Sequence, residues 1–291
     1  MIAAALFAVA FVPAGAAEDV YAAEIEAWRA ARFERLRRPD GWLTLAGLFW
    51  LDPGANSFGS DPANRVVLPA GTPGCMGELV LEGGSVRLRT LPGMTLTTRG
   101  KSVADALLRT DADGDPTVLE YGHVSFFVIK RRDRFAVRVK NSASQTLSAF
   151  GGLDAFRIEA RWRFEARFEP YDPPKQVLVP NVIGGADREI CPGAIVFDFE
   201  GATYRLDPVL ESGTDELFII FGDRTNGFET YGAGRFLYAK RPEKDGRLIL
   251  DFNKAYNPPC VFTPYATCPL PPAQNRLPFR VEAGEKVYGD H

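Results

Sequence analysis

Between residues 64 and 140 the chain alternates apolar and polar positions with a period of two. Stretches such as ELVLE, SVRLRT and FAVRVK place their apolar side chains on one face, which is the pattern of a half-buried β-strand. Gly-Gly, Pro-Gly and Asp-Gly-Asp separate these stretches and favour turns. We therefore predict a small β-sandwich over residues 40–145.

A helical periodicity precedes this region. Apolar side chains recur at Tyr21, Ile25, Trp28 and Leu36, and Pro39 follows. Because a residue before proline disfavours the helical conformation, we predict one helix over residues 19–38.

Residues 1–17 have the composition of a secretory signal. The segment is apolar up to Pro13, and Ala14-Gly15-Ala16 then provides a small-x-small cleavage site, although no basic residues precede the apolar run. It is too short to span a bilayer, and no later apolar run is long enough to do so. We therefore expect an exported, soluble protein that is periplasmic or secreted; the alternative is that residues 1–17 form part of a buried N-terminal helix.

The second half also has the patterns of strands. RWRFEARFE alternates, IVFDFEGATYRLDPV predicts a hairpin that turns at Glu200-Gly201, and LFIIF predicts a buried strand. A Ser- and Gly-rich stretch over residues 141–154 separates the halves. We predict a mainly β protein whose C-terminal domain, residues 155–288, is an antiparallel β-barrel or curled sheet.

Composition excludes several classes of function. The net charge of -3 disfavours nucleic acid, which needs a basic face. Only two histidines are present, so clustered histidine metal sites are excluded, and His123 in an apolar strand is the only one suited to a catalytic triad. No phosphate-binding loop, dinucleotide fingerprint or GxSxG elbow occurs. We therefore expect no cofactor and no metal; the oligomeric state stays open.

The segment GDRTNGFETYGAGRFLY, residues 222–238, is the first candidate for chemistry. Gly232 and Gly234 lack side chains, so another group can approach the backbone closely. Arg235 follows in a strand, where a guanidinium needs a carboxylate or an anionic ligand. A structural ion pair and a ligand clamp are both open. The candidate carboxylate partners are Asp223, Asp251 and Glu282.

The proline-rich segment over residues 251–278 is the second candidate. Prolines fix the backbone and remove donors, and the asparagines at 253, 257 and 275 can bond to the backbone. Such a rigid loop suits either a structural plug or the presentation of polar groups to a ligand.

Four cysteines allow three pairings, and Cys260 with Cys268 is the nearest pair. Such a disulfide would add about 2–3 kcal/mol to stability in the chain-entropy model. Cys260 could also be a free structural thiol or a nucleophile, although the shortage of histidine bases weakens the last idea.

DRTNGFETYGAGRFLY and LDFNKAYNPPCVFTPYATCPLPPAQNRLPFRVEAGEK together resemble a bacterial and archaeal family of uncharacterised proteins, the domain of unknown function 1684. The resemblance covers roughly residues 22 to 286 and includes GWLTLAGLFWLDPGANSFGS near the start. It implies no activity, and relatives without export signals that share the cysteines would argue against a disulfide. Separately, the layout of the first domain is similar to that of forkhead-associated domains. The residues that match the motif of the domain of unknown function 1684 are Thr230, Tyr231, Gly234, Arg235, Asp251, Asn253, Tyr256, Asn257, Pro258, Pro259, Cys260, Cys268, Pro269, Asn275, Glu282 and Lys286.

We hypothesise that the two segments line one polar pocket for a small anionic or hydroxylated ligand. The expected ligand contacts are Tyr231, Arg235, Asn253, Tyr256, Asn257 and Asn275. An alternative is a hydrolase or lyase in which Asp251 or Glu282 works with a tyrosine such as Tyr256. A structural or envelope interaction protein without a pocket is the third possibility.

Overall fold

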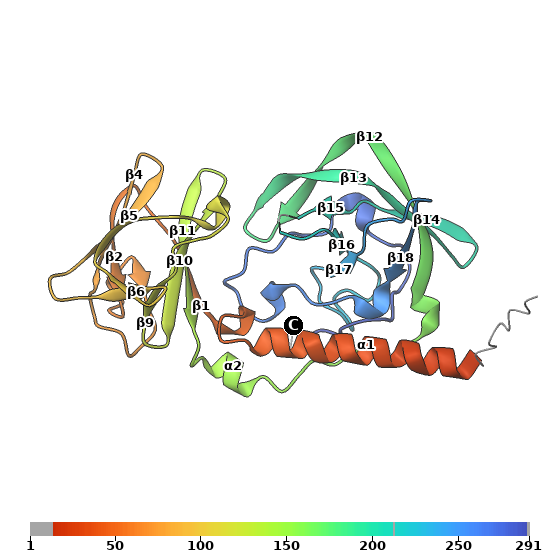
Figure 1. Ribbon diagram of the computed structural model, residues 1–291, viewed down its shortest axis with the longest axis horizontal. Coiled ribbons are helices and arrows are strands. Elements are labelled where there is room, and N and C mark those ends of the chain that lie inside the picture. Colours follow the sequence, from red (N-terminus) through yellow and green to blue (C-terminus); the bar gives the residue numbers. More distant parts are fainter. Residues whose placement is uncertain (1–13, 212, 290–291) are drawn as a thin grey trace, which may run out of the picture. The chain divides into compact units, whose positions relative to one another are not determined.

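The computed structural model describes residues 14–211 and 213–289 and is mainly β with one long N-terminal helix, as predicted (Figure 1). Its contacts divide the chain into two units. The sandwich unit comprises Glu34–Gly152 and Pro259–Cys268. The C-terminal unit comprises Met1–Phe33, Leu153–Pro258 and Pro269–His291. Residues 259–268 thus belong to the sandwich unit, although they lie inside the proline-rich segment.

The sandwich unit consists of two sheets. In spatial order, the six-stranded sheet contains β1 (Leu45–Trp50), β11 (Arg134–Asn141), β10 (Val124–Arg131), β9 (Leu119–Tyr121), β6 (Leu96–Thr98) and β7 (Lys101–Val103). The five-stranded sheet contains β3 (Val66–Val67), β2 (Gly54–Gly59), β4 (Gly77–Glu82), β5 (Ser85–Thr90) and β8 (Asp105–Leu108). A short helix, α2 (Gln145–Ala149), follows β11, and single 3-10 turns occur at Trp42–Thr44, Asp111–Asp113 and Pro259–Val261.

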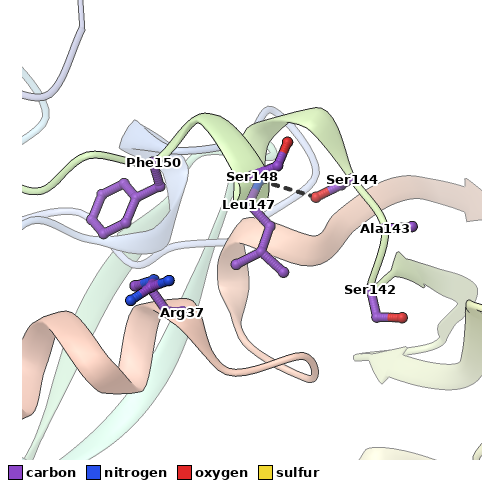
Figure 2. Close-up of a pocket in the computed structure, with 7 residues that line it drawn as sticks. All are labelled: Arg37, Ser142, Ala143, Ser144, Leu147, Ser148 and Phe150. Atoms are coloured by element: carbon purple, nitrogen blue, oxygen red, sulfur yellow. Dashed lines mark hydrogen bonds between the residues drawn. The ribbon is translucent and has the colours of Figure 1, made fainter.

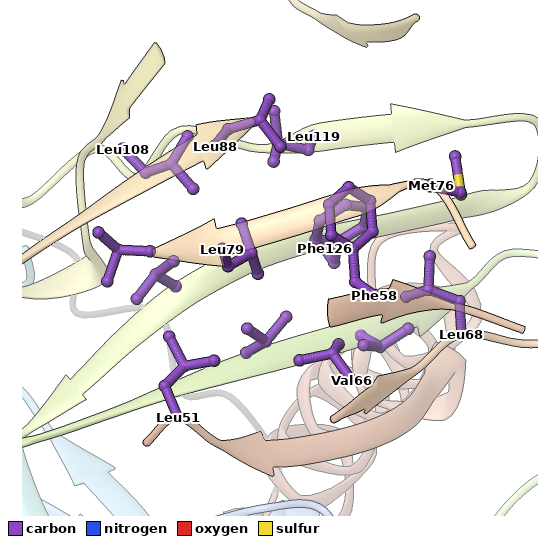
Figure 3. Close-up of a cluster of buried hydrophobic side chains, with 14 of the residues drawn as sticks. Leu51, Phe58, Val66, Leu68, Met76, Leu79, Leu88, Leu108, Leu119 and Phe126 are labelled. Atoms are coloured by element: carbon purple, nitrogen blue, oxygen red, sulfur yellow. The ribbon is translucent and has the colours of Figure 1, made fainter. Parts of the chain in front are cut away.

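The alternating positions of these strands form one core. Leu79 and Leu88 from one sheet and Phe126 from the other are buried in the same cluster (Figure 3). Phe58 and Phe126 pack with ring centroids 5.5 Å apart. The period-two pattern predicted that each strand has one apolar face. Burial of these faces between the two sheets drives the folding of this unit.

The C-terminal unit contains a curled, half-barrel sheet, in which β12 and β13 form long, bent ribbons (Figure 1). Its four-stranded sheet has the order β14 (Ala202–Leu206), β13 (Gly185–Phe199), β12 (Arg163–Asn181) and β18 (Arg247–Asp251). A three-stranded sheet has the order β15 (Val209–Leu210), β16 (Leu217–Phe221) and β17 (Arg235–Ala239). Further 3-10 turns occur at Ala160–Trp162, Phe252–Lys254 and Ala273–Asn275. The predicted hairpin at Glu200-Gly201 is confirmed, because Phe199 pairs with Ala202 across it.

The N-terminal helix α1 spans Ala14–Arg37. The predicted signal segment therefore falls partly outside the described residues, and its last four residues belong to the helix. Ile25 and Leu36, two members of the apolar stripe, are fully buried or nearly so. Within the described residues, no helix combines the length and the apolar character needed to cross a bilayer.

The two motif segments lie side by side in the C-terminal unit. Phe236 and Tyr256 exchange two backbone hydrogen bonds of 2.9 Å. The N–H of Gly222 donates to the carbonyl of Asn275 at 3.0 Å. Gly234 has a φ of +93°, and a Cβ there would overlap Pro271 and the carbonyl oxygen of Phe221. The group that approaches the backbone at Gly234 is therefore Pro271 of the proline-rich segment.

We expect Gly234→Ala to lower the free energy of unfolding by about 2–5 kcal/mol, because left-handed strain and overpacking add. Urea unfolding of the purified protein measures this change. Gly227→Ala is the matched control, since Gly227 has a φ of +81° and open space at its Cβ position. Equal losses in the two variants would show that the approach of Pro271 contributes nothing.

Candidate functional site

Arg235 lies in the interior of the C-terminal unit with 0% of its surface exposed. Its Nη2 donates to Asp223 Oδ2 at 2.9 Å and to the carbonyl of Val281 at 2.8 Å, and its Nη1 donates to the carbonyl of Ala283. Asp223 is equally buried in this ion pair. A ligand clamp needs a guanidinium that faces solvent, so we leave Arg235 out of the proposed ligand contacts.

The Asp223 carboxylate also organises the loop that joins β16 to β17. Its Oδ1 accepts hydrogen bonds from the N–H and the hydroxyl of Thr225, at 2.8 and 2.6 Å, and from the N–H of Val281 at 3.1 Å. Because both carboxylate oxygens and most guanidinium donors have partners, the desolvated charges are compensated. The pair therefore connects β17 to the loop and to the chain end.

Asn275, another predicted ligand contact, is also fully engaged inside the protein. Its side chain accepts from the N–H of Asp207 at 2.8 Å and donates to the carbonyls of Asp207 and Ile220 at 2.9 and 3.0 Å. This buried asparagine links the proline-rich segment to the residue after β14 and to β16.

Asn257 and Tyr256 meet helix α1 around a buried carboxylate. Glu285 accepts from the N–H of Asn257 at 2.7 Å and from Arg32 Nε at 3.0 Å. The Arg32 guanidinium carbon lies 4.7 Å from the centroid of the Tyr256 ring. Asn257 Nδ2 donates to the carbonyl of Lys286 at 2.6 Å, and the Asn257 carbonyl accepts from Arg32 Nη2 at 3.0 Å. Burial raises the pKa of the Tyr256 phenol despite the nearby Arg32.

The most unusual polar group in this unit is Asp251, at the end of β18. Its Oδ1 accepts from the Tyr21 hydroxyl at 2.8 Å and from the N–H of Asn253 at 3.1 Å. Asn253 is fully buried and donates from Nδ2 to the Tyr21 oxygen at 2.8 Å and to the carbonyl of Glu159 at 2.9 Å. Asp251, Asn253 and Tyr21 therefore form one connected network, which we call the Asp251 site.

Asp251 has one oxygen that this network does not use. The residue is 6% exposed, and its Oδ2 is buried without a hydrogen-bond partner among the described residues. Burial raises the pKa of the carboxyl, while hydrogen bonds from Tyr21 and Asn253 oppose that shift. Burial and the Asp251 charge raise the pKa of the Tyr21 phenol, so Tyr21 stays a hydrogen-bond donor near neutral pH.

The remaining predicted site residues lie outside this network. Glu282 is partly exposed and pairs with Arg280 at 3.0 Å. Tyr231 lies in the loop before β17, and burial raises the pKa of its phenol. The structure thus brings Asp251 together with Asn253, and Tyr256 together with Asn257, but places Asn275 and Glu282 in separate networks.

Helix α1 supplies the groups that the sequence analysis did not select. Tyr21 and Arg32 both reach the motif segments, at Asp251 and at Glu285. Tyr21 belongs to the apolar stripe that predicted the helix, and Arg32 lies four residues after Trp28 on the same face. A tyrosine inside an otherwise apolar stripe was the signal that a buried polar partner exists.

A small pocket of about 280 Å³ in the sandwich unit is a weaker candidate. It is lined by residues from the end of α1 and around α2, including Arg37, Ser144, Leu147 and Phe150 (Figure 2). Ser144 already accepts from the N–H of Leu147 at 3.1 Å and donates to the carbonyl of Leu43. The serine hydroxyls that line the pocket thus already bond to nearby backbone groups. None of the predicted site residues lines this pocket.

Cys260 and Cys268 are joined by a disulfide that closes the segment 259–268. Of the other cysteines, Cys75 is exposed and Cys191 is buried. Burial raises the pKa of the Cys191 thiol to about 11, which keeps it protonated and unreactive. In residues 14–211 and 213–289, no group of three or more His, Cys, Asp or Glu side chains is arranged to hold a metal ion.

Comparison with known proteins places the motif segments in context. A family model described as "Protein of unknown function (DUF1684)" matches residues 148–286. An uncharacterized protein of Haloarcula marismortui, solved by solution NMR, is 30% identical over an alignment that covers 50% of this chain and 80% of that chain, with a TM-score of 0.42. Curated proteins gave no match.

We expect Arg235→Met and Asp223→Asn each to lower the free energy of unfolding by about 3–5 kcal/mol, because each leaves a buried charge or its partners uncompensated. Chemical denaturation measures both, and the double variant should lose less than the sum of the two. Arg241→Met, which removes a solvent-exposed partner of Asp215, is the control and should change stability far less. Additive losses in the double variant would contradict direct coupling.

The raised pKa of Asp251 predicts a pH-dependent difference between the wild type and Asp251→Asn. The folded wild type binds this proton more tightly than the unfolded chain, whose aspartate pKa is about 3.9. Its stability relative to the variant should therefore be greatest below pH ~4 and fall as pH rises through the folded-state pKa.

Urea unfolding at a series of pH values measures this difference. Asp245→Asn is the control with the opposite sign, because a hydrogen bond from the N–H of Arg247 lowers the pKa of Asp245. A difference for Asp251 that rises with pH would show that its pKa is depressed.

Proposed function

Because the chain belongs to the DUF1684 family of proteins of unknown function, we propose its function from the Asp251 site itself: it binds a small hydroxylated molecule there. The observation that carries this proposal is Asp251 Oδ2, a buried acceptor without a partner among the described residues. An unsatisfied buried polar atom costs about 1–3 kcal/mol, and a ligand hydroxyl that donates to it would recover that loss.

The charge at the site selects the ligand class. A carboxylate acceptor favours a neutral or cationic donor and repels an anion at short range. Of the two ligand classes expected from the sequence, the hydroxylated class therefore fits Asp251 and the anionic class does not. Tyr21 and Asn253 hold the carboxylate in place through Oδ1, so that Oδ2 has a fixed direction for recognition.

Acid–base catalysis, in a hydrolase or lyase, is the second candidate, and the raised pKa of Asp251 favours it specifically. A carboxyl whose pKa lies closer to neutrality exchanges a proton more readily with a bound hydroxyl group at physiological pH. Tyr21 is then a positioning residue, because its own phenol keeps its proton. In this candidate the tyrosine partner is Tyr21, and Tyr256 belongs to the neighbouring Arg32–Glu285 cluster.

We also propose that the protein acts outside the cytoplasm. The apolar segment before Ala14-Gly15-Ala16 and the disulfide between Cys260 and Cys268 support this assignment.

A thermal-shift panel of glucose, mannose, glucosamine, sorbitol and inositol tests the binding proposal. We expect at least one compound to raise the melting temperature of the wild type by roughly 2–4 °C for each kcal/mol of stabilisation. Asp251→Asn should abolish that shift, because an amide cannot reproduce the fixed carboxylate acceptor. Asp245→Asn, an exposed aspartate paired with Arg247, is the matched control and should keep it.

Mass spectrometry of each compound after incubation separates binding from turnover. An unchanged compound supports binding alone, whereas a product whose formation falls at least about 100-fold in Asp251→Asn supports the acid–base candidate. A ligand-induced shift of the same size in Asp251→Asn as in the wild type would refute both uses of the site.

A further inference from the structure

A row of cationic side chains runs along the outer face of the six-stranded sheet in the sandwich unit. On β11, Val137 and Val139 point into the core, so the alternating Arg138 and Lys140 lie on the opposite face. Arg131, at the end of β10, lies directly opposite Arg134 in the antiparallel register of β10 and β11. Its side chain therefore lies on this face as well. Segment 259–268 belongs to the same unit and brings Thr267 to it.

Arg138 is the unusual member of the row. It is 6% exposed, and its Nε is buried without a partner. Its Nη2 has one long hydrogen bond, 3.4 Å, to Thr267 Oγ1. Its guanidinium carbon lies 5.3 Å from the centroid of the Trp42 ring. Across the described part of the chain, Arg138 forms no ion pair with any carboxylate.

Arg131 brings a second guanidinium to the same threonine. Its Nε lies 3.4 Å from Thr267 Oγ1, and its Nη1 pairs with Asp111 at 2.6 Å. Asp111 therefore compensates Arg131 and leaves the charge of Arg138 without a counter-ion in direct contact. Trp42, Thr267 and Arg131, which surround the buried guanidinium, are each partly exposed to solvent.

A buried, uncompensated guanidinium carries a large desolvation penalty. Burial, and next the charge of Arg131, lower the pKa of Arg138 to about 10, so it remains protonated at neutral pH. A bound anion would supply the missing charge and accept the hydrogen bond that Nε does not make within the protein. Planar guanidinium groups match the two oxygens of a phosphate or a carboxylate in a bidentate manner.

We propose that Arg138, Arg131 and Thr267 form a binding site for a small oxyanion, a phosphate or carboxylate group, with Trp42 as one wall. The disulfide between Cys260 and Cys268 closes the segment that carries Thr267, which fixes the hydroxyl opposite the two guanidinium groups. This site lies in the sandwich unit and is independent of the Asp251 site.

Isothermal titration of the full chain with inorganic phosphate, in Tris chloride at constant ionic strength, tests the site. A second titration with acetate distinguishes a phosphate from a carboxylate ligand. We expect saturable binding of one of them to the wild type, weakened at least about tenfold in Arg138→Met. Arg138→Lys, which keeps the charge but loses the fork, should bind with intermediate affinity.

Arg89→Gln is the matched control, because Arg89 is an exposed arginine on a strand of the other sheet in the same unit. It should bind the anion as the wild type does. Without anion, Arg138→Met should melt at the same temperature as the wild type or higher, since a buried uncompensated charge has been removed. If Arg138→Met does not fold, Arg131→Met provides the same comparison at a partly exposed position.

Saturable binding of either anion that depends on Arg138 supports the site and identifies the oxyanion. Absence of saturable heat with both anions in the wild type would overturn the proposal. Binding of undiminished affinity in Arg138→Met, or in Arg131→Met where that variant is used, would overturn it as well.

Discussion

The buried pair of Arg235 and Asp223 is the interaction on which the arrangement of the C-terminal unit depends. It joins β17 to the loop after β16, and the carbonyls of Ala283 and Val281 accept further hydrogen bonds from the two Nη atoms of the guanidinium. The stretch that contains Asp223 and Arg235 and the segment near Val281, 46 residues after Arg235, therefore converge on two charges. A charge pair removed from water tolerates little displacement, because each missing hydrogen bond leaves an uncompensated group in a medium of low polarity.

The proline-rich segment contributes Phe252, Ala255 and Leu277 to the core of the C-terminal unit. Its prolines lack backbone donors, so its pairing with β17 is limited to the bridge between Phe236 and Tyr256, and its asparagines bond to neighbouring groups. Asn275 bonds to Asp207 and Ile220, and Asn257 to Glu285 and Lys286. In this segment, hydrogen bonds from asparagine side chains hold the backbone in place, as strand pairing does in a regular sheet.

Among the buried polar atoms without a hydrogen-bond partner in the described residues, Asp251 Oδ2 and Arg138 Nε carry the functional proposals. Asp251 has an acceptor without a donor, whereas Arg138 has donors without an adequate acceptor. The two lie in different units and require opposite ligand chemistry, a hydroxyl group for the first and an oxyanion for the second. Because the remaining buried charges have close partners in most cases, such unsatisfied groups stand out as places where a ligand would complete the structure.

The sequence by itself determined the mainly β fold, the N-terminal helix and the hairpin at Glu200-Gly201, since periodicity and turn residues act over short distances. It also drew attention to Arg235 and to the motif segments, but left open which carboxylate would pair with the arginine. Only the tertiary structure decided for Asp223, and only it brought Tyr21 to Asp251 across 230 residues of chain. Hydrogen bonds between distant residues depend on how whole strands and helices pack, and no local pattern records that geometry.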